Sequence, residues 1–416
     1  MIKYVFISTS PTIVQSLDDY FESSRLNNNN TVFVIEFFKQ EIPTDLPNNC
    51  IPTTDLLDQR ELIRISAILR NLGEIGGIIS LGELALYPAA DLRQKLGLSG
   101  PYKAELEKFR DKVKMKSFFS KSSIKTPKIY SADELRCGKA ILPLVVKPRA
   151  YFGPIGIRVI LSQDELKKLV SIHTKPQPAH YDNNFPELIK DDYQFEEFID
   201  GITYEIAALV HNGLVIHLVV LKQINNSLDF MNGKPLGLVS VYDSIQLQLW
   251  ADFTAKVLNE MNAPNGAYVI QAILNRQNER VFIGASAVPP SISMSRLIKD
   301  MCGVDYRWFH IQCQINEAIN DFSPIKKGLF IGSLIFPMNY IEEGMTSLKI
   351  VKRVYPLPRE LLPTLKSTHY PEIGSIAEKD FSYSHNLGRF LFLNEDPIAI
   401  EREIRIAMEL YNVEVS

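Results

Sequence analysis

The first hundred residues alternate short β-rich runs with a segment of helical period. The β-rich runs cover residues 3–8, 31–37 and 76–83, and apolar residues recur at helical spacing over residues 57–73. Strands that alternate with helices indicate parallel pairing, because a parallel connection needs a long crossover between its two strands. The chain is therefore predicted to begin with a parallel α/β sheet, whose ligands would bind in loops at the carboxyl ends of the strands.

The composition is that of an ordinary globular protein. The 416 residues are 46% hydrophobic and 22% charged, and the length predicts two to four domains at roughly 100–200 residues each. A net charge of −3 argues against a dedicated nucleic-acid binder. No apolar run approaches the roughly 20 residues that span a bilayer, and the first residues lack the long apolar stretch of a signal peptide. The four cysteines form no CxxC pair. We therefore expect a cytoplasmic protein with neither nucleic acid nor membrane as a partner.

From about residue 108 the pattern changes to hairpins and short strands. In chain order, the predicted elements are a lysine-rich helix running into an extended segment over 110–131, a strand–loop–strand over 142–160, hairpins over 193–221 and 268–286, and a last helix over 397–411. The dipeptide Asn212-Gly213 marks the turn of the first hairpin, because both residues tolerate the positive φ that two-residue hairpin loops require. Hairpins mixed with helices predict α+β character for this region.

A lysine beside a glycine-containing loop is the first chemical signal. Lys147 ends an apolar strand, and the loop that follows contains Gly153 and Gly156. An ammonium group supplies positive charge, while small residues let backbone N–H groups approach phosphate oxygens. Lys112, about one element earlier, could add a second positive charge. Taken alone, each lysine is more often a solvated surface residue than a phosphate ligand.

A pair of acidic residues leads into an apolar segment later in the chain. Glu196 and Glu197 are followed by Phe198 and Ile199. Such a segment could form a hinge whose backbone binds adenine, and Glu205 could then accept hydrogen bonds from ribose hydroxyls. The alternative is an edge strand with solvated acids.

Taken in order, five segments resemble motifs of the ATP-grasp superfamily, and in particular its carboxylate–amine ligase branch. That branch includes L-amino-acid ligases and is related to biotin carboxylase and phosphoribosylglycinamide synthetase. The segments are GGIISLGELALYPAADLRQKLGLSGP, RDKVKMKSFFSKSSIKTPKIY, LVVKPRAYFGPIGIRVI, EEFIDGITYEI and SISMSRLIKDMCGVDY. The resemblance covers nearly the whole chain, and it is the order of the motifs that makes it specific.

The resemblance implies an ATP-binding protein whose relatives transfer the γ-phosphate to a carboxylate and then form an amide bond with an amine. It implies that Lys112 and Lys147 contact phosphates and that Gly153 and Gly156 lie in a mobile lid loop. The remaining implied nucleotide contacts are Glu196, Glu197, Phe198 and Ile199 at adenine, Glu205 at ribose and, more weakly, Lys222 at phosphate.

The sequence departs from the family at the metal site. Two strands there normally carry a glutamate on the first and Glu-x-Asn-x-Arg on the second, which hold Mg²⁺ and the reacting carboxylate. Here the corresponding residues are Gln271 on the first strand, and Gly284, Ser286 and Val288 on the second. Mg²⁺ is usually bound through one or two carboxylates, phosphate oxygens and water, and both carboxylates are missing at these positions. Whether Mg²⁺ binds is therefore left open.

Two functions follow from this contrast. The favoured one is a nucleotide-binding protein with lost or reduced catalysis, a pseudoenzyme that acts beside a partner or an active paralogue. The alternative is an active ATP-dependent ligase with an unusual metal site. A purely structural α/β protein without a nucleotide is a third interpretation.

The resemblance also sets the expected organisation. A Rossmann-like domain over residues 1–108 precedes the ATP-grasp domain over 109–323, whose lid covers about 126–200, and a small α+β domain over 324–416 ends the chain. An amino acid or other carboxylate is the expected substrate, and homodimers are common in this branch.

Overall fold

The structure is a computed structural model that describes residues 2–10, 13–17, 20, 26–37, 42–150, 157–171, 193–319, 324–325, 327–337, 349–377 and 386–416. Across these ranges, no helix combines the length and the apolar character needed to cross a membrane.

The amino-terminal region forms a sheet of four parallel strands in the order β3-β2-β1-β4. The strands are β1 (Lys3–Ser8), β2 (Thr31–Glu36), β3 (Cys50–Thr53) and β4 (Ile75–Ser80), and the helices are α2 (Gln59–Asn71) and α3 (Leu86–Leu96). The carboxylate of Asp58 caps α2 by accepting a hydrogen bond from the backbone N–H of Arg60. Apolar side chains of both helices pack on the sheet. The predicted parallel α/β sheet is confirmed.

The centre of the molecule is an antiparallel sheet of eight strands in the order β13-β12-β9-β10-β11-β14-β18-β16. The strands are β9 (Gly201–His211), β10 (Leu214–Ile224), β11 (Leu236–Ser240), β12 (Gly266–Asn275), β13 (Arg280–Ser286), β14 (Phe330–Phe336), β16 (Leu365–His369) and β18 (Gly388–Asn394). Asn212 and Gly213 have φ values of 51° and 75°, as the predicted hairpin between β9 and β10 requires.

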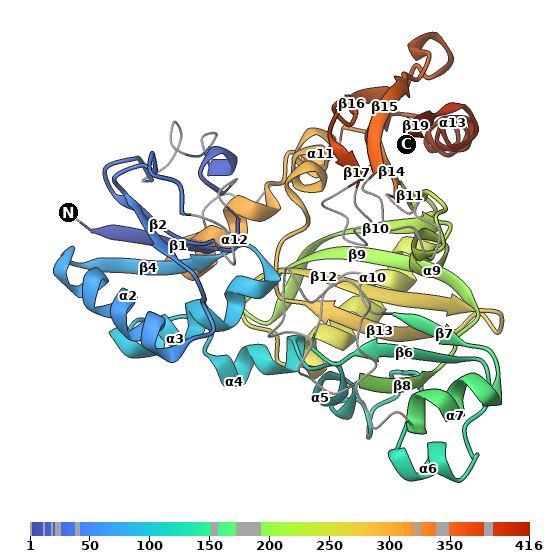
Figure 1. The fold of residues 1–416 in the computed structure, drawn as a ribbon, viewed down its shortest axis with the longest axis horizontal. Coiled ribbons are helices and arrows are strands. Elements are labelled where there is room, and N and C mark those ends of the chain that lie inside the picture. The colour runs from blue at the N-terminus through green and yellow to red at the C-terminus, as the bar shows by residue number, and fades with distance from the viewer. Residues whose placement is uncertain are drawn as a thin grey trace.

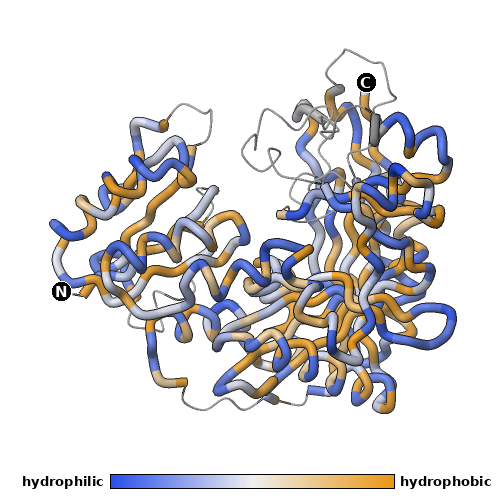
Figure 2. The backbone as a smooth tube through the Cα atoms, turned by 90° about the horizontal axis from the view of Figure 1, so that it is seen from below, coloured by the Kyte–Doolittle hydropathy of each residue, from blue (hydrophilic) through white to orange (hydrophobic). Residues whose placement is uncertain are grey.

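Helices cover both faces of this sheet. Successive side chains of a strand point to opposite faces, and each face carries apolar residues that pack against helices. Tyr204 of β9 packs against Trp250 of α10 (Ser244–Glu260), with ring centroids 4.5 Å apart. Leu209 of the same strand belongs to the core on the other face, together with Leu297 of α11 (Ile292–Cys302) and Phe309 of α12 (Tyr306–Gln314). Figure 2 shows orange, hydrophobic stretches of the tube in the interior of both the part that contains the N-terminus and the larger part of the molecule.

A smaller sheet of four strands lies beside the central one, in the order β5-β8-β6-β7. Its strands are β5 (Ile129–Tyr130), β6 (Leu144–Pro148), β7 (Arg158–Ile160) and β8 (Tyr193–Glu197), and its helices are α6 (Ala132–Arg136) and α7 (Gln163–Ser171). We call it the lid sheet. The short helices α4 (Lys103–Leu106) and α5 (Lys112–Ser117) lead to it from the amino-terminal region (Figure 1).

The carboxyl-terminal segment continues the central sheet through β14, β16 and β18. It adds a second sheet in the order β17-β15-β19, formed by β15 (Lys349–Tyr355), β17 (Ile376–Ala377) and β19 (Asn412–Val415), and the helix α13 (Pro397–Leu410). Helix α13 packs so closely against β14 that a side chain at Gly332 would collide with it: an added Cβ would lie 2.5 Å from Ile400 Cγ2 and 2.8 Å from Ile404 Cδ1.

Replacing Gly332 by alanine is expected to lower the free energy of unfolding by about 1–3 kcal/mol, because α13 must shift to admit the methyl group. The urea midpoint measures this loss. Gly284→Ala is the matched control, since the nearest atom to its added Cβ is Met115 Sδ at 4.0 Å. Equal midpoints for the two variants would contradict the tight packing of α13.

Helix α12 joins the amino-terminal sheet to the central one. The side-chain amide of Gln314 accepts a hydrogen bond from Ser80 N and donates one to Ser80 O, both at 3.0 Å. One turn earlier, His310 Nδ1 accepts a hydrogen bond of 2.9 Å from Ala267 N of β12. Figure 1 shows α12 lying between the two regions.

Candidate functional site

Two buried lysines meet one buried carboxylate between α5 and the lid sheet. Lys147 lies on β6 opposite Gln194 of β8, and Glu196 lies two residues further along β8 on the same face. Lys147 Nζ is 2.7 Å from Glu196 Oε2, and Lys116 Nζ of α5 pairs with Glu196 Oε1. All three side chains are at most 6% exposed. We call Lys116, Lys147 and Glu196 the lysine cluster.

The lysine cluster places two amines beside one carboxylate away from water. Burial lowers the pKa of Lys147 to about 7, and the nearby charge of Lys112 contributes to this lowering. Burial also lowers the pKa of Lys112 to about 8 and that of Lys116 well below its ordinary value. Such shifts reflect the cost of charged groups that lack enough counter-charge. An anion bound beside these amines would raise their pKa values again.

Backbone and side-chain contacts fasten the start of α5 to the end of β6. Lys112 N donates to Arg149 O at 3.0 Å, and Lys112 Nζ lies 3.4 Å from Pro148 O. Arg149 Nη2 pairs with Asp111 Oδ2 at 2.7 Å, and Arg110 Nη2 donates to Ala150 O at 2.9 Å. These contacts fix the residues that precede the glycine-containing loop.

Gly153 and Gly156, the predicted phosphate-loop glycines, lie outside the described residues. The predicted hinge is described: residues 198–200 join β8 of the lid sheet to β9 of the central sheet. Glu197 is exposed, and its backbone N–H donates to Lys128 O at 2.8 Å. Phe198 and Ile199 are half-buried. The structure thus separates the two acids, because Glu196 belongs to the lysine cluster and Glu197 faces solvent.

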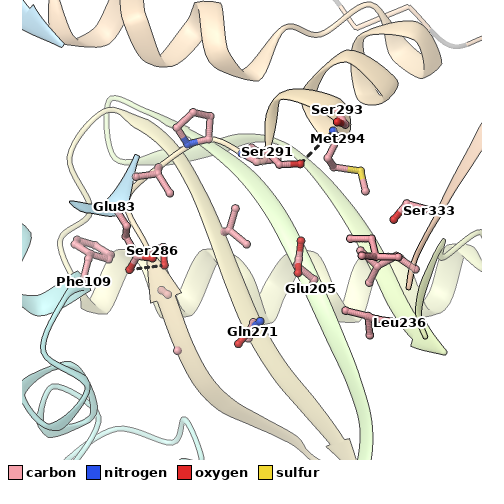
Figure 3. A pocket seen from close by; sticks show the side chains of 18 of the residues that line it. Glu83, Phe109, Glu205, Leu236, Gln271, Ser286, Ser291, Ser293, Met294 and Ser333 are labelled. Atoms are coloured by element: carbon pink, nitrogen blue, oxygen red, sulfur yellow. Dashed lines mark hydrogen bonds between the residues drawn. The ribbon is translucent and has the colours of Figure 1, made fainter. Parts of the chain in front are cut away.

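A cavity of about 320 Å³ lies over the central sheet next to α5. Its floor is a row of three residues at matching positions on neighbouring strands: Glu205 on β9, Gln271 on β12 and Gly284 on β13. Figure 3 shows Glu205 and Gln271 side by side beneath the cavity. Burial raises the pKa of Glu205 to about 7.

Ser286 stands on β13 at the position where the family carries an asparagine, and its side chain contacts a residue of the amino-terminal region. Ser286 Oγ donates to Glu83 Oε1 at 3.1 Å (Figure 3), and the same oxygen is 2.9 Å from Arg110 Nη1. Glu83 follows β4, at the carboxyl end of the amino-terminal sheet. Val288, where the family has an arginine, also lines the cavity.

The residues at this floor do not fit the divalent cation that the fold family would place there. Glu205 offers the one carboxylate, Gln271 offers one neutral oxygen and Gly284 offers no side chain, while Glu83 is engaged by Arg110. Within the described ranges, no group of three or more histidine, cysteine, aspartate or glutamate side chains is placed to hold a metal ion.

Lys222 is not brought together with the other predicted residues. It pairs across the sheet with Tyr204, on the face opposite Glu205, and its Nζ is 2.8 Å from Glu401 Oε2 of α13. Sequence reasoning also missed Lys116 and Glu83. Lys116 lies one helical turn beyond Lys112, a spacing that signals a shared face. Glu83 lies just after a parallel strand, where ligands commonly bind.

Comparisons with solved structures agree with this architecture. The L-amino acid ligase from Bacillus licheniformis superposes with a TM-score of 0.75 at 16% identity, covering 99% of this chain and 98% of that chain. Phosphoribosylglycinamide synthetase from Anaerococcus prevotii gives 0.62 at 15% identity over 100% of both chains. The biotin carboxylase domain of 2-oxoglutarate carboxylase from Hydrogenobacter thermophilus, solved with MgADP, ADP and bicarbonate, gives 0.68 at 17% identity over 100% of this chain and 91% of that chain.

No protein-family model and no curated protein matches the sequence. The structural likenesses cover nearly the full length, and they show that the chain has the ATP-grasp fold of carboxylate–amine ligases. The fold predicted from the motifs is confirmed.

Proposed function

We propose that this protein binds ATP or ADP between the lid sheet and the central sheet, and that its Mg²⁺-dependent phosphoryl transfer is lost or strongly reduced. The observation that carries the binding proposal is the lysine cluster, with Lys112 beside it. These groups place three amines and one carboxylate next to the residues that enter the glycine-containing loop, and a bound anion would stabilise the positively charged form of the amines. A polyphosphate is the ligand that this charge would bind.

The hinge supports the position of the base. Residues 198–200 leave the lid sheet and enter the central sheet, so their backbone borders the space between the two. Phe198 and Ile199 offer half-buried apolar surface there. Adenine would lie against this segment with its phosphates directed toward Lys147.

The proposal of reduced catalysis rests on Gln271 and Gly284, which face each other across β12 and β13 where the family carries two glutamates. A metal clamp on phosphoryl oxygens contributes several kcal/mol to the stabilisation of the transition state. Losing about 4 kcal/mol slows a step about a thousandfold. The role of such a protein would be to bind a ligand or a partner subunit, either a second copy or an active paralogue.

An active ATP-dependent ligase is the second candidate function. The cavity of about 320 Å³ beside α5 favours it, because Glu205, Arg110 and Arg389 line this cavity and offer charged groups to a substrate. An amino acid or other carboxylate would be its substrate. We also propose a cytoplasmic location, in keeping with four cysteines that are all unpaired.

Calorimetric titration of ADP and ATP tests the proposal. We expect binding in EDTA, and a change of less than about threefold on adding Mg²⁺, because Gln271 and Gly284 stand where two carboxylates would hold the ion and Glu205 is the one acid left on the floor. A rise of tenfold or more with Mg²⁺ would favour the ligase, and release of phosphate with amino acids would then establish it. Absence of binding under both conditions would contradict every nucleotide-binding function.

A further inference from the structure

Glu205 is the one acidic side chain among the three residues that form the floor of the cavity. It lies on β9 between Leu221 of β10 and Gln271 of β12. In the part of the chain that the structure describes, no hydrogen bond or ion pair is found for its carboxyl group, whereas Glu83, the other acid at this cavity, pairs with Arg110. The carboxyl group of Glu205 therefore faces the space of the cavity.

Such a group is costly to keep charged. Moving a carboxylate away from water without a partner is strongly unfavourable, and a buried acid responds with a raised pKa. The pKa of Glu205 is raised to about 7 by burial. A cation bound in the cavity would remove this cost, so the arrangement suits a positively charged ligand group.

The surroundings distinguish the kind of cation. Mg²⁺ and Ca²⁺ need about six oxygen ligands or more, and they bind where many oxygens converge. Beside Glu205, the amide of Gln271 offers one neighbouring oxygen on the floor, and Gly284 offers no side chain. An ammonium group needs fewer partners, because it has three donors that one carboxylate and one amide oxygen largely satisfy.

The walls indicate what carries that ammonium group. Leu236 and Leu238 of β11, Ile335 of β14 and Leu391 of β18 line the cavity on the side of Glu205. Figure 3 places Leu236 near Glu205 and away from Glu83. A hydrocarbon body packed on these side chains is favoured by about 25 cal/mol for each Å² removed from water. The volume of about 320 Å³ limits the ligand to a compact molecule.

We infer that Glu205 is the recognition carboxylate for the ammonium group of a compact apolar amine, whose hydrocarbon part packs on Leu236, Leu238 and Leu391. The inference names a ligand class for the cavity and rests on the proposed function only in placing the nucleotide beside the cavity, with its phosphates between the lysine cluster and the positions of Gln271 and Gly284. The amine is therefore tested without nucleotide, so that either idea can fail alone.

The experiment compares three ligands with one hydrocarbon body: 3-methylbutylamine, 3-methylbutan-1-ol and 3-methylbutanoate. Calorimetric titration at pH 8 should give at least tenfold tighter binding for the amine than for the alcohol, and the weakest binding for the acid. Glu205→Gln should abolish the preference for the amine, whereas Glu360→Gln, at an exposed position far along the chain, should keep it. Equal binding of amine and alcohol, or a preference that survives in Glu205→Gln, would overturn the inference.

Two further measurements separate amine recognition by Glu205 from a metal site and from titration of Lys112. MgCl₂ alone should cause no binding signal; a signal that disappears in Glu205→Gln would assign a metal site and overturn the inference.

The unmodified protein should bind the amine about tenfold more tightly at pH 8 than at pH 6, because Glu205 ionises near pH 7 while an alkylamine stays charged. Lys112, Arg110, Glu83 and Arg389 also line the cavity, and the pKa of Lys112 is about 8. A pH dependence that persists in Glu205→Gln would therefore belong to Lys112 and contradict the inference.

Discussion

Glu196→Gln is expected to lower the free energy of unfolding by about 3–5 kcal/mol, because it removes the carboxylate that pairs with both buried amines, those of Lys116 and Lys147. Glutamine keeps the size and shape of the side chain, so the decrease in the free energy of unfolding measures the contribution of the negative charge. A loss of this size is a large share of the roughly 5–15 kcal/mol that stabilises a typical domain. Urea unfolding at pH 7 measures it.

The neighbouring residue supplies the control. Glu197→Gln changes an exposed acid on the same strand and should cost less than about 0.5 kcal/mol. The loss in Glu196→Gln should also shrink between pH 7 and pH 9. Both lysine pKa values lie below their unfolded values near 10.4 in the folded protein, and removing the carboxylate lowers them further. The free energy of unfolding therefore rises more steeply with pH in the variant than in the unmodified protein. A loss below about 1 kcal/mol at pH 7 would show that the lysines need no counter-charge.

The double variant Gln271→Glu with Gly284→Glu is expected to give nucleotide binding that strengthens at least tenfold with Mg²⁺. The two positions face each other across β12 and β13, and a side chain at Gly284 meets no atom closer than Met115 Sδ at 4.0 Å from its Cβ. Two carboxylates beside the proposed phosphates complete the oxygen ligands that Mg²⁺ prefers.

Calorimetry with ADP, in Mg²⁺ and in EDTA, measures the change. Gly284→Gln is the control, since it fills the same space with a neutral side chain and should leave the response to Mg²⁺ below threefold, as in the unmodified protein. If the ADP affinity of the double variant does not change with Mg²⁺, the proposal that Gln271 and Gly284 make nucleotide binding insensitive to Mg²⁺ is contradicted.

Much of the fold could be predicted because its signals are local. Asn212-Gly213 fixes a hairpin through positive φ, and the order of motifs places Gln271 opposite Gly284 before any register is known. Strand β3 could not be predicted, because it has four residues and contains Pro52, which lacks a backbone donor. The lysine-rich helix is shorter than predicted: α5 ends at Ser117, and Ser122 Oγ accepts from Ile124 N in a turn that competes with the helix.

The site was harder to predict than the fold, because its charges come from distant segments. Nothing local in the sequence joins Lys116 to Glu196, which lie 80 residues apart, or Ser286 to Glu83, which lie 203 apart. The pattern around Glu205 is that of any strand residue, and only the register of β9 and β12 places it on the cavity floor. Whether a carboxylate has a partner depends on the packed structure and not on spacing.

The contacts of α12 have a consequence for how the molecule can open. Gln314 is hydrogen-bonded to β4 of the amino-terminal sheet and His310 to β12 of the central sheet, so α12 couples these two sheets into one frame. The lid sheet is joined to that frame through residues 198–200 on one side and through the backbone bond from Phe282 N to Lys125 O on the other. The lysine cluster adds buried ion pairs between α5 and the lid sheet, so any movement of the lid sheet away from α5 would have to separate these charges out of contact with water, which opposes such a movement.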